Sequence, residues 1–198
     1  MIDLNDKTKT RIIEKAIELF NEHGYENVSM RDLANSLNIS PGNLTYHFKK
    51  KTDILYEIIQ ILIKEHERRQ FTPEITLSEF NAILLSVSEH QRKYVFYYRN
   101  FVELKKKYSR IAKMQANFKA EFIALIKDAL RYFVMNGWLK EECHEDMYEN
   151  LSIAILSITT FWTQFNIDKD MTCVVWSILL PNLTEKGQNE YKKNIQEL

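Results

Sequence analysis

The nine residues from Ser40 to Phe48 carry polar side chains on one face of a short predicted helix and apolar ones on the other. Ser40 is a capping residue, and Pro41 fits the first helical position because an N–H is not needed there. Leu44 and Phe48 lie four positions apart and are expected to point inward. The opposite face is expected to carry Pro41, Gly42, Asn43, Thr45 and Tyr46. Amide and hydroxyl groups of this kind form hydrogen bonds to phosphates and to base edges.

The chain around this helix is basic, although the chain as a whole is neutral. Its 198 residues contain 27 Lys and Arg and 27 Asp and Glu. Residues 29–51 carry Arg31 and three lysines at 49–51 against Asp32, which gives this stretch a net charge of +3. A phosphate backbone is the partner that such a charge favours. The alternative is a solvated basic turn within a helical bundle.

Three further predicted helices position this segment. An amphipathic pattern predicts a helix over 7–23, which ends at Gly24. A second starts at Ser29 and stops near residue 37, because Ser29 and Asp32 have the spacing of a capping box. A fourth is capped by Thr52 and runs towards Arg69. Two short helices joined by a turn of three or four residues pack at a steep angle, and the second can enter the major groove of DNA.

The motifs of this region resemble a known family. They are Thr10-Arg-Ile-Ile-Glu-Lys-Ala-x-Glu-Leu-Phe20, Gly24-Tyr25, Met30-Arg-Asp-Leu-Ala34 and Ser40-Pro-Gly-Asn-Leu-x-Tyr-His-Phe-Lys-x-Lys51. They resemble the DNA-binding domain of the tetracycline-repressor (TetR) family of bacterial transcriptional regulators, over about residues 7–55. The resemblance implies an all-α homodimer with an N-terminal helix-turn-helix domain. It also implies a larger C-terminal region that dimerises and often binds a small-molecule inducer.

The resemblance implies roles for individual residues. Pro41 to His47 would be the recognition helix, with residues 42, 43 and 45 near bases. The resemblance places Ser29, Tyr46, His47, Lys49 and Lys51 on phosphates. Thr45 departs from the family, because an aromatic residue is common at this position. The predicted domains are 1–52, which binds DNA, and 53–198, which senses a ligand and dimerises. The predicted DNA-binding residues are Ser29, Arg31, Pro41, Gly42, Asn43, Thr45, Tyr46, His47, Lys49 and Lys51.

The rest of the chain is also predicted to be helical, because only 4 Gly and 3 Pro leave few sharp turns. Thr76 and Glu79 form a second capping-box pattern that opens a helix to about residue 90. Further helices are predicted over 92–107, 109–136, 145–167 and 170–194, and Pro181 should kink or split the last one. The predicted fold class is therefore all-α.

Two apolar segments near the C-terminus are candidates for a subunit interface. Residues 151–165 are apolar over more than half of the helix circumference, and residues 173–180 are equally apolar. A pair of such helices suits a two-fold four-helix interface, and the alternative is the core of a single subunit. Residues 150–167 are uncharged and nearly long enough to cross a bilayer. Eight of these 18 residues are Asn, Ser, Thr or Gln, which favours burial against protein over a membrane span.

A ligand site is predicted among the helices of residues 77–165, where aromatic residues gather. Apolar walls with a few polar groups are typical of small-molecule sites, although most of these aromatics are expected to be core. Asn117 and Gln164 are additional polar candidates. The predicted ligand-binding residues are Tyr97, Tyr98, Phe101, Gln115, Phe118, Phe122 and Trp162.

Other classes of function are disfavoured. The four scattered glycines exclude a phosphate-binding P-loop, a dinucleotide fingerprint and a Gly-x-Ser-x-Gly elbow, so neither an enzyme nor a cofactor is expected. The five histidines are scattered, and residues 143–146 are better explained as a helix start than as a metal site. Two cysteines and an N-terminus without a secretory signal predict a cytoplasmic protein.

Two functions therefore remain open. The first is a DNA-binding regulator that binds a pseudo-palindromic operator as a homodimer, responds to a small hydrophobic effector and has no membrane partner. Repression is expected, and activation is the alternative. The second is a helical module that binds a ligand or a partner protein without binding DNA.

Overall fold

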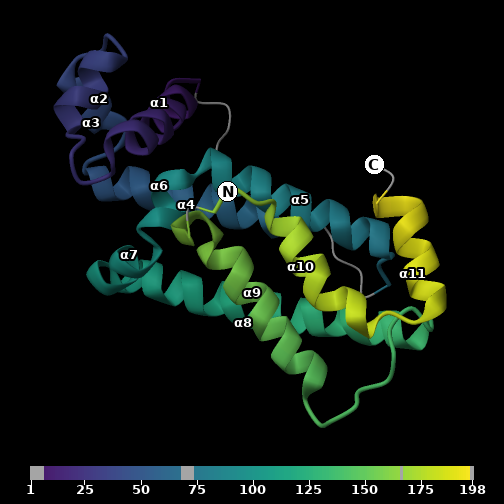
Figure 1. Cartoon of the computed structure of the whole chain (residues 1–198). Coiled ribbons are helices and arrows are strands. Elements are labelled where there is room, and N and C mark those ends of the chain that lie inside the picture. The colour runs from purple at the N-terminus through teal and green to yellow at the C-terminus, as the bar shows by residue number, and fades with distance from the viewer. Residues whose placement is uncertain (1–6, 68–73, 166, 197–198) are drawn as a thin grey trace. The chain divides into compact units, whose positions relative to one another are not determined.

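The computed structural model describes residues 7–67, 74–165 and 167–196, which confirm the all-α prediction (Figure 1). Within these ranges the only β-type pairing is an isolated bridge between Leu139 and Leu183. The chain forms two compact units. Unit 1 consists of Met1–Arg69 and Lys93–Asn100, and unit 2 consists of Gln70–Arg92 and Phe101–Leu198.

Unit 1 contains the helices expected of a helix-turn-helix domain. They are α1 (Lys7–His23), α2 (Met30–Ser36), α3 (Pro41–His47), α4 (Lys51–Glu67) and the short α6 (Val95–Arg99). The cap predicted at Thr52 is wrong. Helix α4 already begins at Lys51, because the Asp53 carboxylate accepts a hydrogen bond from the Lys50 N–H at 3.0 Å. The end of this helix, which the sequence predicts towards Arg69, lies outside the described residues.

Unit 2 contains the longer helices. They are α5 (Leu77–Lys93), α7 (Phe101–Lys107), α8 (Ser109–Met135), α9 (Met147–Phe165), α10 (Met171–Leu179), a 3₁₀ turn (Leu180–Asn182), α11 (Glu185–Tyr191) and a π-helical turn (Lys192–Gln196). The capping box that opens α5 is confirmed, because the Thr76 N–H donates to the Glu79 carboxylate at 2.7 Å. The split at Pro181 and the end of the longest helix before Gly137, with φ +68°, are also confirmed.

The single helix predicted over 92–107 is wrong. The chain leaves helical geometry at Tyr94, with φ −118° and ψ 42°, and again at Asn100, so α5, α6 and α7 are separate. Two side-chain amides explain these breaks. Asn21 accepts the Phe96 N–H at 3.0 Å, and the Asn100 side chain donates to the Phe96 carbonyl at 2.7 Å. Neither amide partner could be inferred from the periodicity of the segment.

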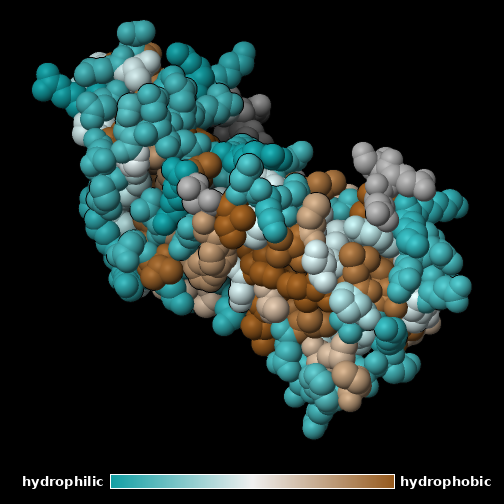
Figure 2. Space-filling view, viewed as in Figure 1, coloured by the Kyte–Doolittle hydropathy of each residue, from teal (hydrophilic) through white to brown (hydrophobic). Residues whose placement is uncertain are grey.

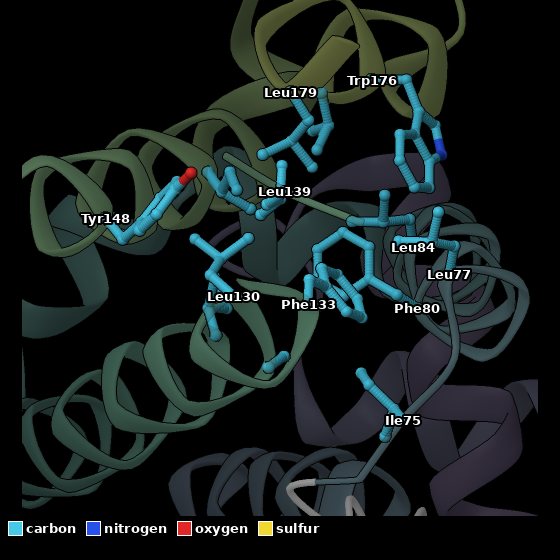
Figure 3. Close-up of a cluster of buried hydrophobic side chains, with 14 of the residues drawn as sticks. Ile75, Leu77, Phe80, Leu84, Leu130, Phe133, Leu139, Tyr148, Trp176 and Leu179 are labelled. Carbon is cyan, nitrogen blue, oxygen red and sulfur yellow. The ribbon is translucent and has the colours of Figure 1, made fainter. Parts of the chain in front are cut away.

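The core of unit 2 is built on aromatic rings from separate helices (Figure 3). The Phe80 ring meets the rings of Phe133 and Trp176 edge-on, with centroids 5.7 and 5.9 Å away. The Trp176 indole N–H donates to the Asn81 side chain at 2.9 Å. Gly187 packs so closely on Trp138 that a Cβ there would lie 2.0 Å from the Trp138 carbonyl oxygen. None of the described helices has the length and hydropathy of a membrane span.

Candidate nucleic-acid interface

Apolar contacts inside unit 1 hold the helix-turn-helix pair on α1 and α4. Phe20 of α1 is fully buried and meets the Tyr25 and Phe96 rings with centroids 5.1 and 5.3 Å away. Leu33 of α2 and Leu44 of α3 are also fully buried. The short helices therefore have fixed apolar faces, and this determines which side chains face solvent.

The turn between α2 and α3 has the geometry of a helix C-cap. Asn38 has φ +54°, a left-handed conformation that asparagine tolerates better than most residues. The Asn38 N–H donates to the Asn35 carbonyl and the Ile39 N–H to the Ala34 carbonyl, both at 3.1 Å. These two bonds form a Schellman motif, which ends α2 and redirects the chain into α3.

Capping side chains begin both helices of the pair. The Ser29 hydroxyl donates to the Asp32 carboxylate at 2.6 Å and accepts the Asp32 N–H at 3.1 Å, which confirms the predicted capping box. The hydrogen bonds from the Ser29 hydroxyl and N–H lower the pKa of Asp32 below its usual value. Ser40 caps α3 by accepting the Asn43 N–H at 3.1 Å. The hydrogen bonds of the Ser29 hydroxyl to Asp32 therefore compete with its predicted contact with phosphate.

The two faces of α3 differ as the sequence predicts. Leu44 and Phe48 are buried, whereas residues 41, 42, 43 and 45 are exposed. Tyr46 is 85% exposed, and its ring meets the half-buried His47 ring edge-on at 5.2 Å. The Thr45 hydroxyl donates back to the helix, with its oxygen 3.0 Å from the Pro41 carbonyl. Thr45 therefore offers a methyl group and an acceptor oxygen rather than a donor.

The cations of the predicted site fall into two groups. Arg31, Lys49 and Lys50 are exposed. Lys51 is half-buried, and its ammonium donates to the carbonyls of Tyr25, Glu26 and Val28 at 2.6, 3.3 and 2.7 Å. It also lies 4.4 Å from the centre of the Tyr25 ring. Three acceptors match the three N–H groups of an ammonium, so Lys51 holds the loop between α1 and α2.

A second polar anchor, which the sequence does not predict, joins α1 to the segment Lys93–Asn100. The Asn21 side chain donates to the Lys93 carbonyl at 2.9 Å and accepts the Phe96 N–H. Glu65 of α4 accepts from the Lys93 ammonium at 2.8 Å and from the Tyr94 hydroxyl at 3.0 Å. The chain therefore enters unit 1 a second time between α5 and α7. An isolated Asn in an amphipathic helix gives no signal of this role.

The predicted ligand-binding residues do not form one group. Tyr97 and Tyr98 are buried in unit 1, where burial raises the pKa of Tyr98. In unit 2 the Phe118 ring stacks on Phe122 at 5.5 Å, and the Gln115 amide donates to the Phe101 carbonyl at 3.3 Å. Trp162 packs on the apolar core, and Phe101 meets the Phe161 ring at 5.8 Å.

A small apolar cavity lies between α5, α8 and α9 of unit 2. Its volume is about 10 Å³, which is room for about one water molecule. Phe122 is the only predicted ligand residue in its wall. The wall contains no polar side chain and consists of Ile75, Phe80, Ile83, Leu84, Phe122, Leu125, Ile126, Ala129 and Ile155.

The fold and the exposed face of α3 define a helix-turn-helix protein, and comparison with known proteins gives its family. Residues 12–58 match the model for bacterial regulatory proteins of the tetR family. Residues 60–191, more than half of the chain, match the TetR model described as a bacterial transcriptional repressor. The chain belongs to the TetR family of bacterial transcriptional regulators.

Individual relatives agree with this assignment. HTH-type transcriptional regulators of Staphylococcus aureus are 46% identical over 54 residues, which are 27% of this chain and 29% of theirs. The match thus spans less than a third of these curated relatives. A TetR-family regulator from Marinobacter aquaeolei VT8 aligns with a TM-score of 0.86 and 28% identity over 96% of this chain and 98% of its own. A putative regulator from Saccharomonospora viridis, solved in complex with choline, shares the fold at a TM-score of 0.73 and 19% identity over 90% and 98%.

Proposed function

We propose that this chain is a homodimeric transcriptional repressor that binds a pseudo-palindromic operator and leaves it when a small apolar effector binds. The observation that carries the proposal is α3, a seven-residue helix whose buried face is Leu44 and whose outward face ends in the exposed Tyr46 ring. The exposed Tyr46 hydroxyl is of a type that contacts phosphate, and Asn43 and Thr45 lie on the same exposed face of α3. Two copies related by a two-fold axis place their α3 helices about 10 base pairs apart, or at a multiple of that spacing.

The outward faces of α9 and α10 support the pairing of two copies. No charged residue occurs from Asn150 to Phe165 or from Met171 to Leu179. Ile153 and Phe165 of α9 are 44% and 58% exposed. In Figure 2 hydrophobic side chains gather over these two helices. Two such helices from each copy give the uncharged four-helix interface that obligate dimers use.

The effector site is best supported at the cavity between α5, α8 and α9. A wall of nine apolar residues gives no hydrogen bond to a charged or strongly polar ligand. An uncharged apolar molecule is therefore the ligand class that fits, and it must displace side chains because the cavity is small. The segment Lys93–Asn100 continues directly from α5, so a shift of α5 is transmitted to α1 through Asn21. A coupling of about 1.4 kcal/mol changes DNA affinity tenfold.

The proposed function is tested by selecting bound duplexes from a random DNA library and measuring their affinities by gel shift. We expect symmetric half-sites and a dimer in sedimentation. Tyr46→Ala should weaken binding to all sequences about tenfold, whereas Asn43→Ala should lower the preference at one or two base pairs by about 1–3 kcal/mol. Asn189→Ala in unit 2, which also removes an exposed amide, is the matched control and should change neither.

The alternative function, a helical module that does not bind DNA, predicts that these DNA-binding effects are absent. In that case no duplex is enriched, and the wild type and both α3 variants elute identically from heparin at low salt. That result would disprove the proposed function.

A further inference from the structure

The exposed charges of unit 2 are separated along α8. At the start of this helix lies a basic corner, which we define as Lys105, Lys106, Lys107, Arg110 and Lys113. All five side chains are exposed, and the only acidic residue in 103–113 is Glu103, which pairs with Lys106 at 3.5 Å. The net charge of these eleven residues is +4. Because the whole chain is neutral, the corner is balanced by an excess of acid elsewhere.

Much of that excess lies beyond the other end of α8. Residues 141–146 carry Glu141, Glu142, Glu145 and Asp146 with no Lys or Arg, a net charge of −4. All four side chains are exposed. Helix α8 has 27 residues, so it separates the two groups by about 40 Å. At this separation the two groups barely attract each other, because salt screens charges over a Debye length of about 8 Å under physiological conditions.

The dipole of α8 adds to this separation of charge. The positive end of a helix dipole is its N-terminus, and there α8 has Arg110 and Lys113 in its first two turns and no acidic residue in the first. Cations at this end are unfavourable in a free protein. They become favourable when an anion with several charges binds beside them, because helix N–H groups and side chains then act on the same charge.

The position of the corner in the chain connects it to the DNA-binding unit. Asn100 is the last residue of the segment that belongs to unit 1, and α7 begins at the next residue. Lys105 follows five positions later, whereas Glu141 follows only after the whole of α8. The basic corner is therefore nearer in the sequence to unit 1 than the acidic residues are.

We propose that the basic corner binds backbone phosphates of the same duplex, outside the base pairs that α3 reads. The inference rests on the proposed function, and it adds a second contact from unit 2 that carries no base specificity. Lysine and arginine side chains on phosphates raise affinity for every sequence alike.

The test compares two variants of equal net charge on two lengths of DNA. The first carries Lys105→Gln, Lys106→Gln and Lys113→Gln. The control carries Lys169→Gln, Lys192→Gln and Lys193→Gln, which are exposed lysines of unit 2 outside the corner. Affinity for the selected operator is measured between 50 and 200 mM salt, on a minimal duplex and on one with about 10 additional base pairs at each end, or one helical turn.

We expect the wild type and the control to bind the longer duplex more tightly and with a steeper salt dependence. The corner variant should lose this gain. Each lost phosphate contact lowers the slope of log affinity against log salt by about 0.9, so one contact per protomer lowers it by about 2 in a dimer. Circular dichroism of the variants should match the wild type, because no substituted side chain is buried.

Three results would overturn the inference. Equal slopes for both variants on both duplexes would show that the corner does not touch DNA. An equal loss on the short and the long duplex would place it inside the operator instead. Corner-dependent binding to phosphatidylglycerol vesicles with unchanged DNA slopes would assign it to an anionic membrane. A wild type that binds no duplex at all would instead refute the proposed function.

Discussion

Both units bury an apolar core, and they differ in how far polar bonds to the backbone determine the bounds of their helices. In unit 1 the helix-turn-helix pair has only seven residues in each helix, and polar bonds to the backbone determine where each helix begins and ends. The carbonyls held by Lys51, the left-handed Asn38 and the Ser29 cap are examples. In unit 2 the longer helices pack through a continuous apolar core around Phe80, Phe133 and Trp176 (Figure 3).

This difference fits the function proposed above for each unit. Polar bonds are directional, so they fix the pose of a short helix that must fit a groove of defined width. Apolar packing is non-directional, and a core with a small cavity can repack around a bound molecule. In the proposed function, unit 1 therefore keeps a constant geometry and unit 2 changes its geometry. Substitutions in each unit can test this contrast.

The largest effect is expected in the core of unit 2. Phe133→Ala removes a ring that is 1% exposed, and the resulting cavity should lower the free energy of unfolding by about 3–5 kcal/mol. All three tryptophans, at positions 138, 162 and 176, belong to unit 2, so tryptophan fluorescence reports its unfolding. A fluorescence transition that stays at the wild-type denaturant concentration would contradict the role of this ring.

A smaller effect is expected from the polar anchor of unit 1. Lys51→Met leaves three backbone carbonyls without the ammonium and should destabilise unit 1 by about 2 kcal/mol, the typical value for hydrogen bonds to a charged group. Far-UV circular dichroism should show an early transition that fluorescence does not.

The neighbouring residue provides the control for this anchor. Lys50→Met removes an exposed charge and should leave both transitions unchanged, while lowering the slope of log DNA affinity against log salt by about 0.9 if it contacts phosphate. If Lys51→Met also changed only the salt slope, Lys51 would be a DNA ligand rather than an anchor.

The contrast also explains how far sequence alone could predict the molecule. Capping patterns and the spacing of Leu44 and Phe48 are local, so α2 and α3 could be placed within a residue or two. The role of Lys51 depends on carbonyls more than twenty positions away, and the Asn21 anchor on a segment more than seventy away. The separation of α5 from α6 follows from that same anchor. Partners at such distances leave no periodic signal, and for the same reason the aromatic residues of 77–165 did not reveal the cavity wall.

The smallest effect concerns the two capping boxes, which place one carboxylate in each unit. Hydrogen bonds from Ser29 lower the pKa of Asp32, and hydrogen bonds from Thr76 lower the pKa of Glu79. A carboxyl whose pKa is lower in the folded state stabilises the fold above its unfolded pKa, and this contribution disappears as the pH falls through the folded pKa. Both contributions are therefore complete at neutral pH and are lost below about pH 4.

Matched variants separate the two boxes. Asp32→Asn and Glu79→Gln should each make the free energy of unfolding less dependent on pH in the acid range. Circular dichroism measures the unfolding of unit 1, and tryptophan fluorescence measures that of unit 2. Only Asp32→Asn should also weaken DNA binding at neutral pH, because the Ser29 box sets the start of α2, and α2 supports α3. If both variants weakened DNA binding equally, the start of α5 would contribute as much to the pose of α3 as the start of α2. The contrast between a constant unit and an adaptable one would then be wrong.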